Sequence, residues 1–160
     1  MNKQKPLFVA GHQPHYLPWI GYFNKIYQSD IFCLVDSIQF KKKWFQNRNK
    51  IRTNNGEITL TVPVKTSRRY YQNICEVEID NNLPWQYNHW KTITLSYKKA
   101  PYFDKYAPFF EEVYKKEWKM LVDLNEYIIR GMLDFFNIKK EILRTSQLKT
   151  EGKKTDLLID

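Results

Sequence analysis

The first residues that could do chemistry lie in the polar segment His12-Gln13-Pro14-His15, which directly follows the apolar run 7–10. Because His12 comes at the end of a short expected strand and Pro14 restricts the backbone, we expect its ring to be held rigidly. A neutral imidazole in such a place can move protons near pH 7, and a charged one can bind an anion. We therefore predict that His12 is a catalytic acid or base. The alternative is a histidine that only hydrogen-bonds the loop backbone.

His15 completes a His-x-x-His spacing with His12. This spacing is similar to the His-x-Gly-His signature of nucleotidylyltransferases, with Pro14 in place of the glycine. In that signature the histidines stabilise charge on the transferring phosphates at a helix N-terminus. The similarity favours a nucleotide-like ligand.

Two further candidates follow the second apolar run of the sequence, residues 31–35. Asp36 closes this run, where α/β folds display polar groups to a ligand, although an aspartate there can also simply start a turn. Arg48 lies within Gln46-Asn47-Arg48-Asn49, where a planar guanidinium among amides suits phosphate and sugar hydroxyls. The alternative for this segment is an exposed basic loop. We predict that His12, Asp36 and Arg48 converge on one concave site, with Asp36 catalytic.

The remaining titratable residues are weaker candidates for a catalytic or metal-binding role. His89 shares an expected helical stripe with Trp85, which is more typical of a hydrogen-bonded core histidine than of a catalyst. Neither the histidines nor the distant cysteines Cys33 and Cys75 have the ligand spacing of a metal site, so no metal is predicted. The sequence indicates no particular cofactor.

The elements that position these residues follow from the pattern of apolar side chains. Residues 7–10 and 31–35 are expected to be buried strands, and residues 19–28 an amphipathic helix that buries Trp19 and Tyr22. This order is a βαβ unit, which makes the strands parallel and places the His12 loop at the carboxyl end of the first strand. Ligands of open α/β sheets bind at that edge.

The rest of the chain extends this α/β pattern. The expected elements are a loop at 41–50, a hairpin turning at 54–56, a strand at 74–79, a helix at 84–96, a helical region at 104–137 and a return to the sheet at Ile142-Leu143. The predicted fold class is α/β, with a mainly parallel, Rossmann-like sheet, a β-hairpin insertion and C-terminal helices.

Composition limits the partners. With 160 residues and 42% apolar content, residues 1–160 should form a single domain. The net charge of +9 implies an anionic partner, such as a sugar nucleotide, a nucleic acid or a phospholipid surface. No apolar run is long enough to span a membrane, nothing resembles an export signal, and we expect a cytoplasmic protein. Residues 155–160 resemble the first turn of a further helix, so we expect the chain to lack a C-terminal segment.

One long motif resembles a known family. Residues 11–23, Gly-His-Gln-Pro-His-Tyr-Leu-Pro-Trp-Ile-Gly-Tyr-Phe, resemble the opening signature of the WbqC-like family, and the similarity continues through Gln39-Phe40, residues 46–49, His89 and residues 100–103. The resemblance covers essentially the whole chain, although family members usually run some tens of residues further. The residues expected to contact substrate are Gln13, His15, Tyr16, Gln39, Gln46, Asn47, Arg48, Asn49 and His89.

What the resemblance implies is a transferase of bacterial surface-polysaccharide (O-antigen) biosynthesis. Such an enzyme would move a small acyl or aminoacyl group, for example glycyl, onto a nucleotide-activated sugar or glycan precursor. A nucleotidylyltransferase-like enzyme that uses the same loop is the second hypothesis. A nucleic-acid-binding module with Trp44, Phe45, Tyr70 and Tyr71 between basic loops is the third, and ranks lowest because no recognised nucleic-acid motif is present. The sequence leaves the oligomeric state open.

Overall fold

The computed structural model describes residues 6–67, 69 and 71–148, and the structural statements below concern these residues. The strands are β1 (Val9–His12), β2 (Ile31–Leu34), β3 (Arg48–Thr53), β4 (Gly56–Thr61) and β5 (Glu141–Arg144). The α-helices are α1 (Ile20–Gln28), α2 (Trp85–Tyr97), α3 (Phe103–Lys115) and α4 (Leu121–Phe135), and two short 3-10 helices are η1 (Ile74–Glu76) and η2 (Thr145–Gln147).

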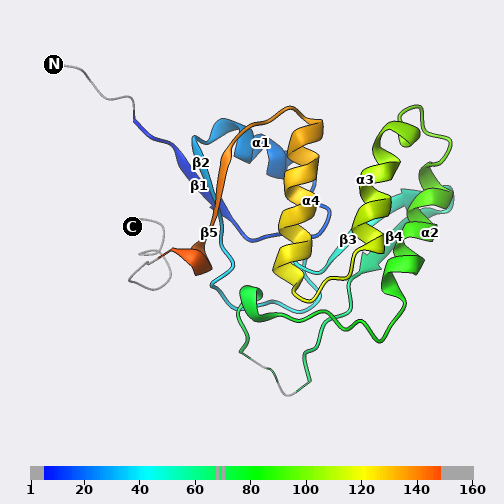
Figure 1. Cartoon of the computed structure of the whole chain (residues 1–160), viewed down its shortest axis with the longest axis horizontal. Helices are drawn as coiled ribbons and strands as arrows, with labels where there is room; N and C mark the ends of the chain where they lie inside the picture. Colours follow the sequence, from blue (N-terminus) through cyan, green and yellow to red (C-terminus); the bar gives the residue numbers. More distant parts are fainter. Residues whose placement is uncertain (1–5, 68, 70, 149–160) are drawn as a thin grey trace.

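The three-stranded parallel sheet has the order β1-β2-β5 (Figure 1). His12 lies opposite Leu34, and Leu34 lies opposite Arg144, so the carboxyl ends of all three strands meet at one edge. This pairing confirms that the first two apolar runs form adjacent parallel strands and that residues 142–143 return to the sheet. Helix α1 supplies the connection between β1 and β2, as expected for a βαβ unit.

One face of this sheet carries a compact apolar core. Phe32 and Leu34 of β2 pack with residues of α1 and α4, among them Phe23, Ile129 and Leu133. Phe32 and Leu34 are two residues apart, so they point to the same face, and α1 and α4 therefore lie on that face together. A Rossmann-like sheet has helices on both faces, and that architecture is not confirmed.

The second part of the molecule is the antiparallel hairpin β3-β4 with helices α2 and α3 beside it (Figure 1). Arg48 lies opposite Thr61 and Thr53 opposite Gly56, which confirms the predicted turn. Gly56 has a φ of +105°, a conformation that glycine adopts without steric cost.

Helix α4 lies between the two parts (Figure 1). Its residues Leu121, Leu124 and Ile128 belong to the core beneath the hairpin, whereas Ile129 and Leu133 belong to the core of the parallel sheet. The positions of these five residues recur at helical spacing around two sides of the helix. One helix thus holds the two parts of the fold together.

Three elements differ from the sequence-based predictions. The expected loop at 41–50 ends earlier, because β3 already begins at Arg48 and pairs with β4. The segment 74–79, expected to be a strand, instead begins with the 3-10 helix η1. Glu76 Oε2 accepts a hydrogen bond from the Asn73 backbone N–H and stabilises the start of η1. Isolated bridges at Glu78 and Ile79 follow. The helical region 104–137 is broken between α3 and α4, where the Trp118 indole donates a hydrogen bond to the Val113 carbonyl.

The burial of the α1 residues was predicted correctly for Tyr22, which is fully buried, and wrongly for Trp19, which is half-exposed. Trp19 precedes the helix, where the backbone is extended, so its side chain does not share the buried stripe of α1. No helix in the described part of the chain is long and apolar enough to cross a membrane. The helical turn expected at 155–160 lies outside the described residues.

Candidate active site at the carboxyl edge of the parallel sheet

His12 occupies the last position of β1, at the edge where ligands of parallel sheets bind. Its side chain is half-buried, and its Nδ1 lies 3.1 Å from the Gln13 carbonyl oxygen. A carbonyl oxygen can only accept a hydrogen bond, so in the neutral ring Nδ1 must carry the proton. The lone pair of the neutral ring then lies on Nε2, which is the atom that can take a proton from a substrate.

The surroundings of His12 keep its ring uncharged. Burial lowers the pKa of His12, the hydrogen bond to Gln13 opposes this shift, and the positive charge of Lys25 adds to it. Lys25 is held near the end of the strand because its Nζ donates to the Gly11 carbonyl over 3.0 Å. At pH 7 the imidazole is therefore neutral and ready to accept a proton.

His15 lies directly against His12. The two ring centroids are 4.6 Å apart, and the rings meet edge to face at 88°. His15 is only 3% exposed, and among the described residues neither of its ring nitrogens has a hydrogen-bond partner. Burial, with a contribution from His12, lowers the pKa of His15 to about 4. A buried polar group without a partner is costly, and such groups are frequent at functional sites.

Trp19 forms an exposed wall beside the two histidines, with its ring centroid 5.8 Å from His12 and 5.7 Å from His15. Its indole lies over the first turn of α1, because a Cβ added at Gly21 would be 2.4 Å from Trp19 Nε1. Trp19 was predicted to lie in the core, so its place beside the histidines was not expected from the sequence. The signal that could have found it is a tryptophan just before a helix whose first turn contains a glycine.

The start of α1 faces this same loop. Trp19 is its N-cap and provides no side-chain hydrogen bond to the first turn, and no acidic residue occurs there. The first backbone N–H groups of the helix are thus not occupied by a capping side chain, and they carry partial positive charge. An anion beside the histidine pair would be stabilised by these groups.

The segment Gln46-Asn47-Arg48-Asn49 holds the histidine loop in place. Gln46 Nε2 donates to Gln13 Oε1 over 2.7 Å, and Gln46 Oε1 accepts from the Lys41 backbone N–H over 2.8 Å. Asn49 Nδ2 donates to the Leu17 carbonyl, where the backbone has a φ of +47°. These amides thus fix a loop that includes a residue in a conformation L side chains rarely adopt.

Two buried asparagines complete this support. Asn47 Nδ2 donates to the Val62 carbonyl over 2.9 Å. Asn125 Nδ2, on helix α4, donates to both the Pro14 and Gln46 carbonyls, at 3.2 and 2.8 Å. Gln46 and Asn47 are both buried, and Gln46 bonds the histidine loop whereas Asn47 bonds Val62. Their contact with a substrate stays a prediction.

Asp36 lies at the carboxyl edge of the sheet, as predicted, but is fully buried. Its Oδ1 accepts from the Ser146 backbone N–H over 2.8 Å and from Thr145 Oγ1 over 3.1 Å, and its Oδ2 accepts from Ser146 Oγ over 2.7 Å. These bonds tie the end of β2 to η2, after β5. In the described chain they involve Thr145 and Ser146 rather than His12.

Arg48 and Gln39 occupy other places in the described part of the fold. Arg48 is half-buried at the start of β3, and because side chains alternate along a strand, it points to the face opposite Asn49. Gln39 is exposed and forms an isolated antiparallel bridge with Asn73. The predicted convergence of Arg48 with His12 stays a prediction.

Tyr16 and His89 belong to a buried network beneath the hairpin. The Tyr16 hydroxyl lies 2.9 Å from His89 Nδ1 and 2.5 Å from the Tyr114 hydroxyl. His89 also hydrogen-bonds the Thr61 backbone, and burial lowers its pKa to about 4. If the N–H of the neutral ring donates to Thr61, Tyr16 donates to Nδ1 and Tyr114 donates to Tyr16. A histidine of the core would form a hydrogen-bonded network of this kind.

No group of three or more potential metal ligands lies together within the described ranges. The site therefore consists of the histidine pair, the half-exposed Trp19 indole and the first turn of α1, which no side chain of the described residues caps. Amide side chains hold the histidine loop in place.

The fold and the site thus define a protein of mixed α/β architecture that carries a histidine loop at the edge of a parallel sheet. The chain belongs to the WbqC-like protein family, whose sequence profile matches residues 13–160. It is also similar to the uncharacterized protein Rv1507c of Mycobacterium tuberculosis, with 30% identity over 151 residues. The match covers 94% of this chain and 65% of that protein, so the chain spans about two thirds of the relative's length. No solved structure matches the chain significantly.

Proposed function

We propose that this protein is a transferase of bacterial surface-polysaccharide biosynthesis, in which His12 is the general base. It moves a small acyl or aminoacyl group, for example glycyl, onto a nucleotide-activated sugar or glycan precursor. Membership of the WbqC-like family supports the biological setting. The observation that carries the chemistry is the contact between His12 Nδ1 and the Gln13 carbonyl, which favours the tautomer with the proton on Nδ1 and the lone pair on Nε2.

The proposed reaction needs one base and no redox partner. The acceptor hydroxyl or amine gives its proton to His12 Nε2 while its oxygen or nitrogen bonds to the carbonyl carbon of the activated acyl donor. The bond from that carbon to the leaving group then breaks, and the imidazolium returns the proton to the leaving group. Because burial lowers the pKa of His12, the neutral ring that can accept a proton is favoured at pH 7, and the imidazolium is a readier proton donor.

The phosphates of a nucleotide-activated sugar fit the charges around this base. The uncapped N-terminus of α1 offers partial positive charge, and Lys25 stands on the following turn with its ammonium against the Gly11 carbonyl. The net charge of +9 favours the approach of an anion. The half-exposed Trp19 offers an aromatic platform for a sugar ring or a base.

A specific observation also favours the second hypothesis, a nucleotidylyltransferase. His12 and His15 are in ring contact between a strand end and a helix N-terminus, the arrangement in which such histidines stabilise a transferring phosphate. In that reaction an acceptor phosphate oxygen bonds to the α-phosphorus of a nucleoside triphosphate and pyrophosphate leaves. Release of pyrophosphate therefore distinguishes the two reactions.

The test begins with ligand binding by the whole chain. Calorimetric titrations with UDP-N-acetylglucosamine, ATP and a single-stranded oligothymidylate separate the three hypotheses. The transferase hypothesis predicts binding of UDP-N-acetylglucosamine, and the nucleotidylyltransferase hypothesis predicts binding of ATP. The nucleic-acid-binding hypothesis predicts binding of the oligothymidylate. We expect the sugar nucleotide to bind and the oligonucleotide not to bind at about 0.15 M salt, where phosphate-only contacts weaken. Tight binding of the oligonucleotide alone would rule out the proposed transferase.

The matched variant is His12→Asn. Its side-chain amide can still donate to the Gln13 carbonyl, so the loop contact survives while the base at Nε2 is lost. In assays with the sugar nucleotide and an activated acyl donor, turnover should fall by roughly 10²-fold or more, with the melting temperature nearly unchanged. Retained turnover in this variant would exclude His12 as the base.

A further inference from the structure

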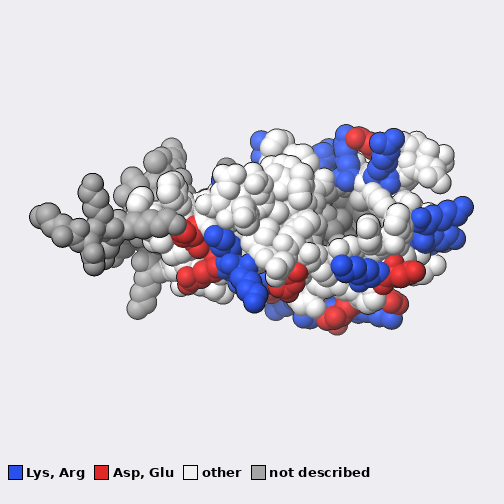
Figure 2. Space-filling view, turned by 90° about the horizontal axis from the view of Figure 1, so that it is seen from above, with Lys and Arg blue, Asp and Glu red and all other residues white. Residues whose placement is uncertain are grey.

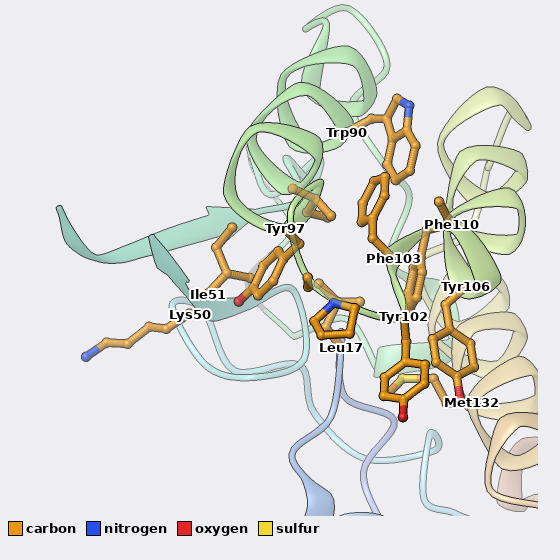
Figure 3. Close-up of a pocket in the computed structure, with 14 residues that line it drawn as sticks. Leu17, Lys50, Ile51, Trp90, Tyr97, Tyr102, Phe103, Tyr106, Phe110 and Met132 are labelled. Carbon is orange, nitrogen blue, oxygen red and sulfur yellow. The ribbon is translucent and has the colours of Figure 1, made fainter. Parts of the chain in front are cut away.

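A cavity lies away from the histidine pair, between α2, α3, the hairpin and the C-terminal half of α4. Its volume is about 460 Å³, and its walls include Ile51, Trp90, Tyr97, Phe103, Phe110 and Met132. Figure 3 shows the aromatic side chains of α2 and α3 gathered around one space, with Met132 of α4 closing one side. The volume falls within the range of about 300–1,000 Å³ that is usual for small-molecule sites.

The walls of this cavity are suited to hydrocarbon. Its lining carries one charged residue, Lys50, and the polar atoms of its aromatic residues are the hydroxyls of Tyr97, Tyr102 and Tyr106 and the indole N–H of Trp90. The Tyr97 hydroxyl already accepts a hydrogen bond from the Arg52 backbone N–H over 3.1 Å. A sugar or a nucleobase would leave several polar groups without partners here, which is costly. A hydrocarbon chain would have no such cost, since apolar burial is favourable.

The opening of the cavity is basic. Lys50 lines the cavity, and its ammonium, which points away from the aromatic side chains in Figure 3, pairs with Glu57 in solvent. Lys98 and Lys99 follow the end of α2, and Lys105 lies over the Tyr106 ring at 5.2 Å. Seen from above, Figure 2 shows a hollow with an uncharged interior, and both basic and acidic side chains lie near its edge. A head group placed at this opening would be favoured if it were negatively charged.

We propose that this cavity binds the hydrocarbon chain of an anionic amphiphile, with its carboxylate or phosphate head group at the Lys50 edge. The site is separate from the histidine pair and does not depend on the proposed transferase activity. Leu17 links the two, because its side chain lines the cavity while its carbonyl is held by Asn49 in the histidine loop. An occupied cavity would thus pack against the segment that carries His15.

The test uses three twelve-carbon probes and one short one, all below the concentrations at which they form micelles. Dodecanoate and dodecyl phosphate should bind the whole chain and change its tryptophan fluorescence, because Trp90 lines the cavity. Dodecanol, which lacks the charge, should bind at least 3-fold more weakly, and butyrate should not bind. A preference between the two anions would identify whether a carboxylate or a phosphate head group is recognised. Equal or tighter binding of dodecanol would overturn the anionic part of the proposal.

The cavity variant is Ala107→Phe, which fills the space from α3, and its matched control is Leu95→Phe on the exposed side of α2, outside the lining. We expect Ala107→Phe to weaken dodecanoate binding by 10-fold or more and Leu95→Phe to leave it unchanged. Unaltered binding in a folded Ala107→Phe protein, or no binding in the original chain, would refute the proposal.

A second pair of variants tests the opening without altering the packing. Lys50→Gln removes the charge at the edge, and Lys119→Gln removes an exposed charge elsewhere. Dodecanoate binding should weaken by at least 3-fold at low salt in the first variant only, and dodecanol binding should not change in either. Equal effects of the two lysine variants would contradict a specific head-group site.

Discussion

The rings of His12 and His15 meet edge to face with centroids 4.6 Å apart at the end of β1. At this distance two positive charges would repel each other strongly, so the pair cannot easily carry two protons. Burial of both rings acts in the same direction, and the pKa values of both lie below the usual 6.5. The pair is therefore neutral at pH 7, and any positive charge that forms during a reaction is held by only one ring.

Acid should destabilise the protein through His15. Its pKa is about 4 in the folded chain and near 6.5 when unfolded, so between these values the unfolded state binds more protons. This contribution to stability is present above pH 6.5 and is lost as the pH falls towards 4. Urea unfolding at pH 7 and pH 4.5 should show a decrease in the free energy of unfolding that is smaller in His15→Phe, which cannot be protonated.

His89 gives the control for this measurement, because burial lowers its pKa to about 4 as well. His89→Phe should also make the acid-induced loss shallower, but it should lower stability at pH 7 because it breaks the bond to Tyr16. An acid dependence of His15→Phe identical to that of the original chain would show that His15 is not buried as a neutral ring.

Gln46 should act through the loop rather than through a ligand. Gln46→Leu removes the donor to Gln13 and the acceptor for the Lys41 backbone, so these part-buried hydrogen bonds are lost. Loss of about 1–3 kcal/mol in the free energy of unfolding is expected for such a change. Chemical denaturation measures this change, with Gln147→Leu at an exposed position as the control. A variant as stable as the control would mean that these bonds do not support the loop.

Asp36 should likewise be a positioning residue. Asp36→Asn keeps the shape but removes the charge that accepts three hydrogen bonds from Thr145 and Ser146, and should cost about 1–3 kcal/mol of stability. Thermal unfolding compares it with Asp134→Asn on the exposed surface of α4. If instead Asp36→Asn kept its stability and lost turnover per folded molecule, the catalytic role predicted from the sequence would stand.

The sequence was informative where local pattern and chemistry agree. The strands are predicted by the apolar runs before His12 and before Asp36 and by the turn Asn54-Asn55-Gly56. The spacing of apolar residues and the choice of turn residues depend only on neighbours in the chain. The beginning of β3 at Arg48 was missed because pairing with Thr61 is a contact between distant residues, and polar side chains give no sign of it.

The sequence predicted the position of the candidate site but not the role of each residue in it. Motif and strand order place His12 and His15 at the edge of the sheet, but nothing in the local sequence says that Gln46 and Asn49 bond the loop from below. Such roles depend on which polar atoms meet after folding, over separations of more than thirty residues. The cavity beside Trp90 was missed for the same reason, because its walls come from four separate elements.

The most direct test of the central claim is to measure the tautomer and the pKa of His12 by proton–nitrogen correlation NMR of the imidazole rings. Comparison with His12→Asn assigns the His12 signals. The hydrogen bond to Gln13 predicts a neutral ring at pH 7 with its proton on Nδ1, and a pKa below 6.5. A proton on Nε2, or a ring that is charged at pH 7, would contradict the account, because His12 could then not accept a proton from the substrate.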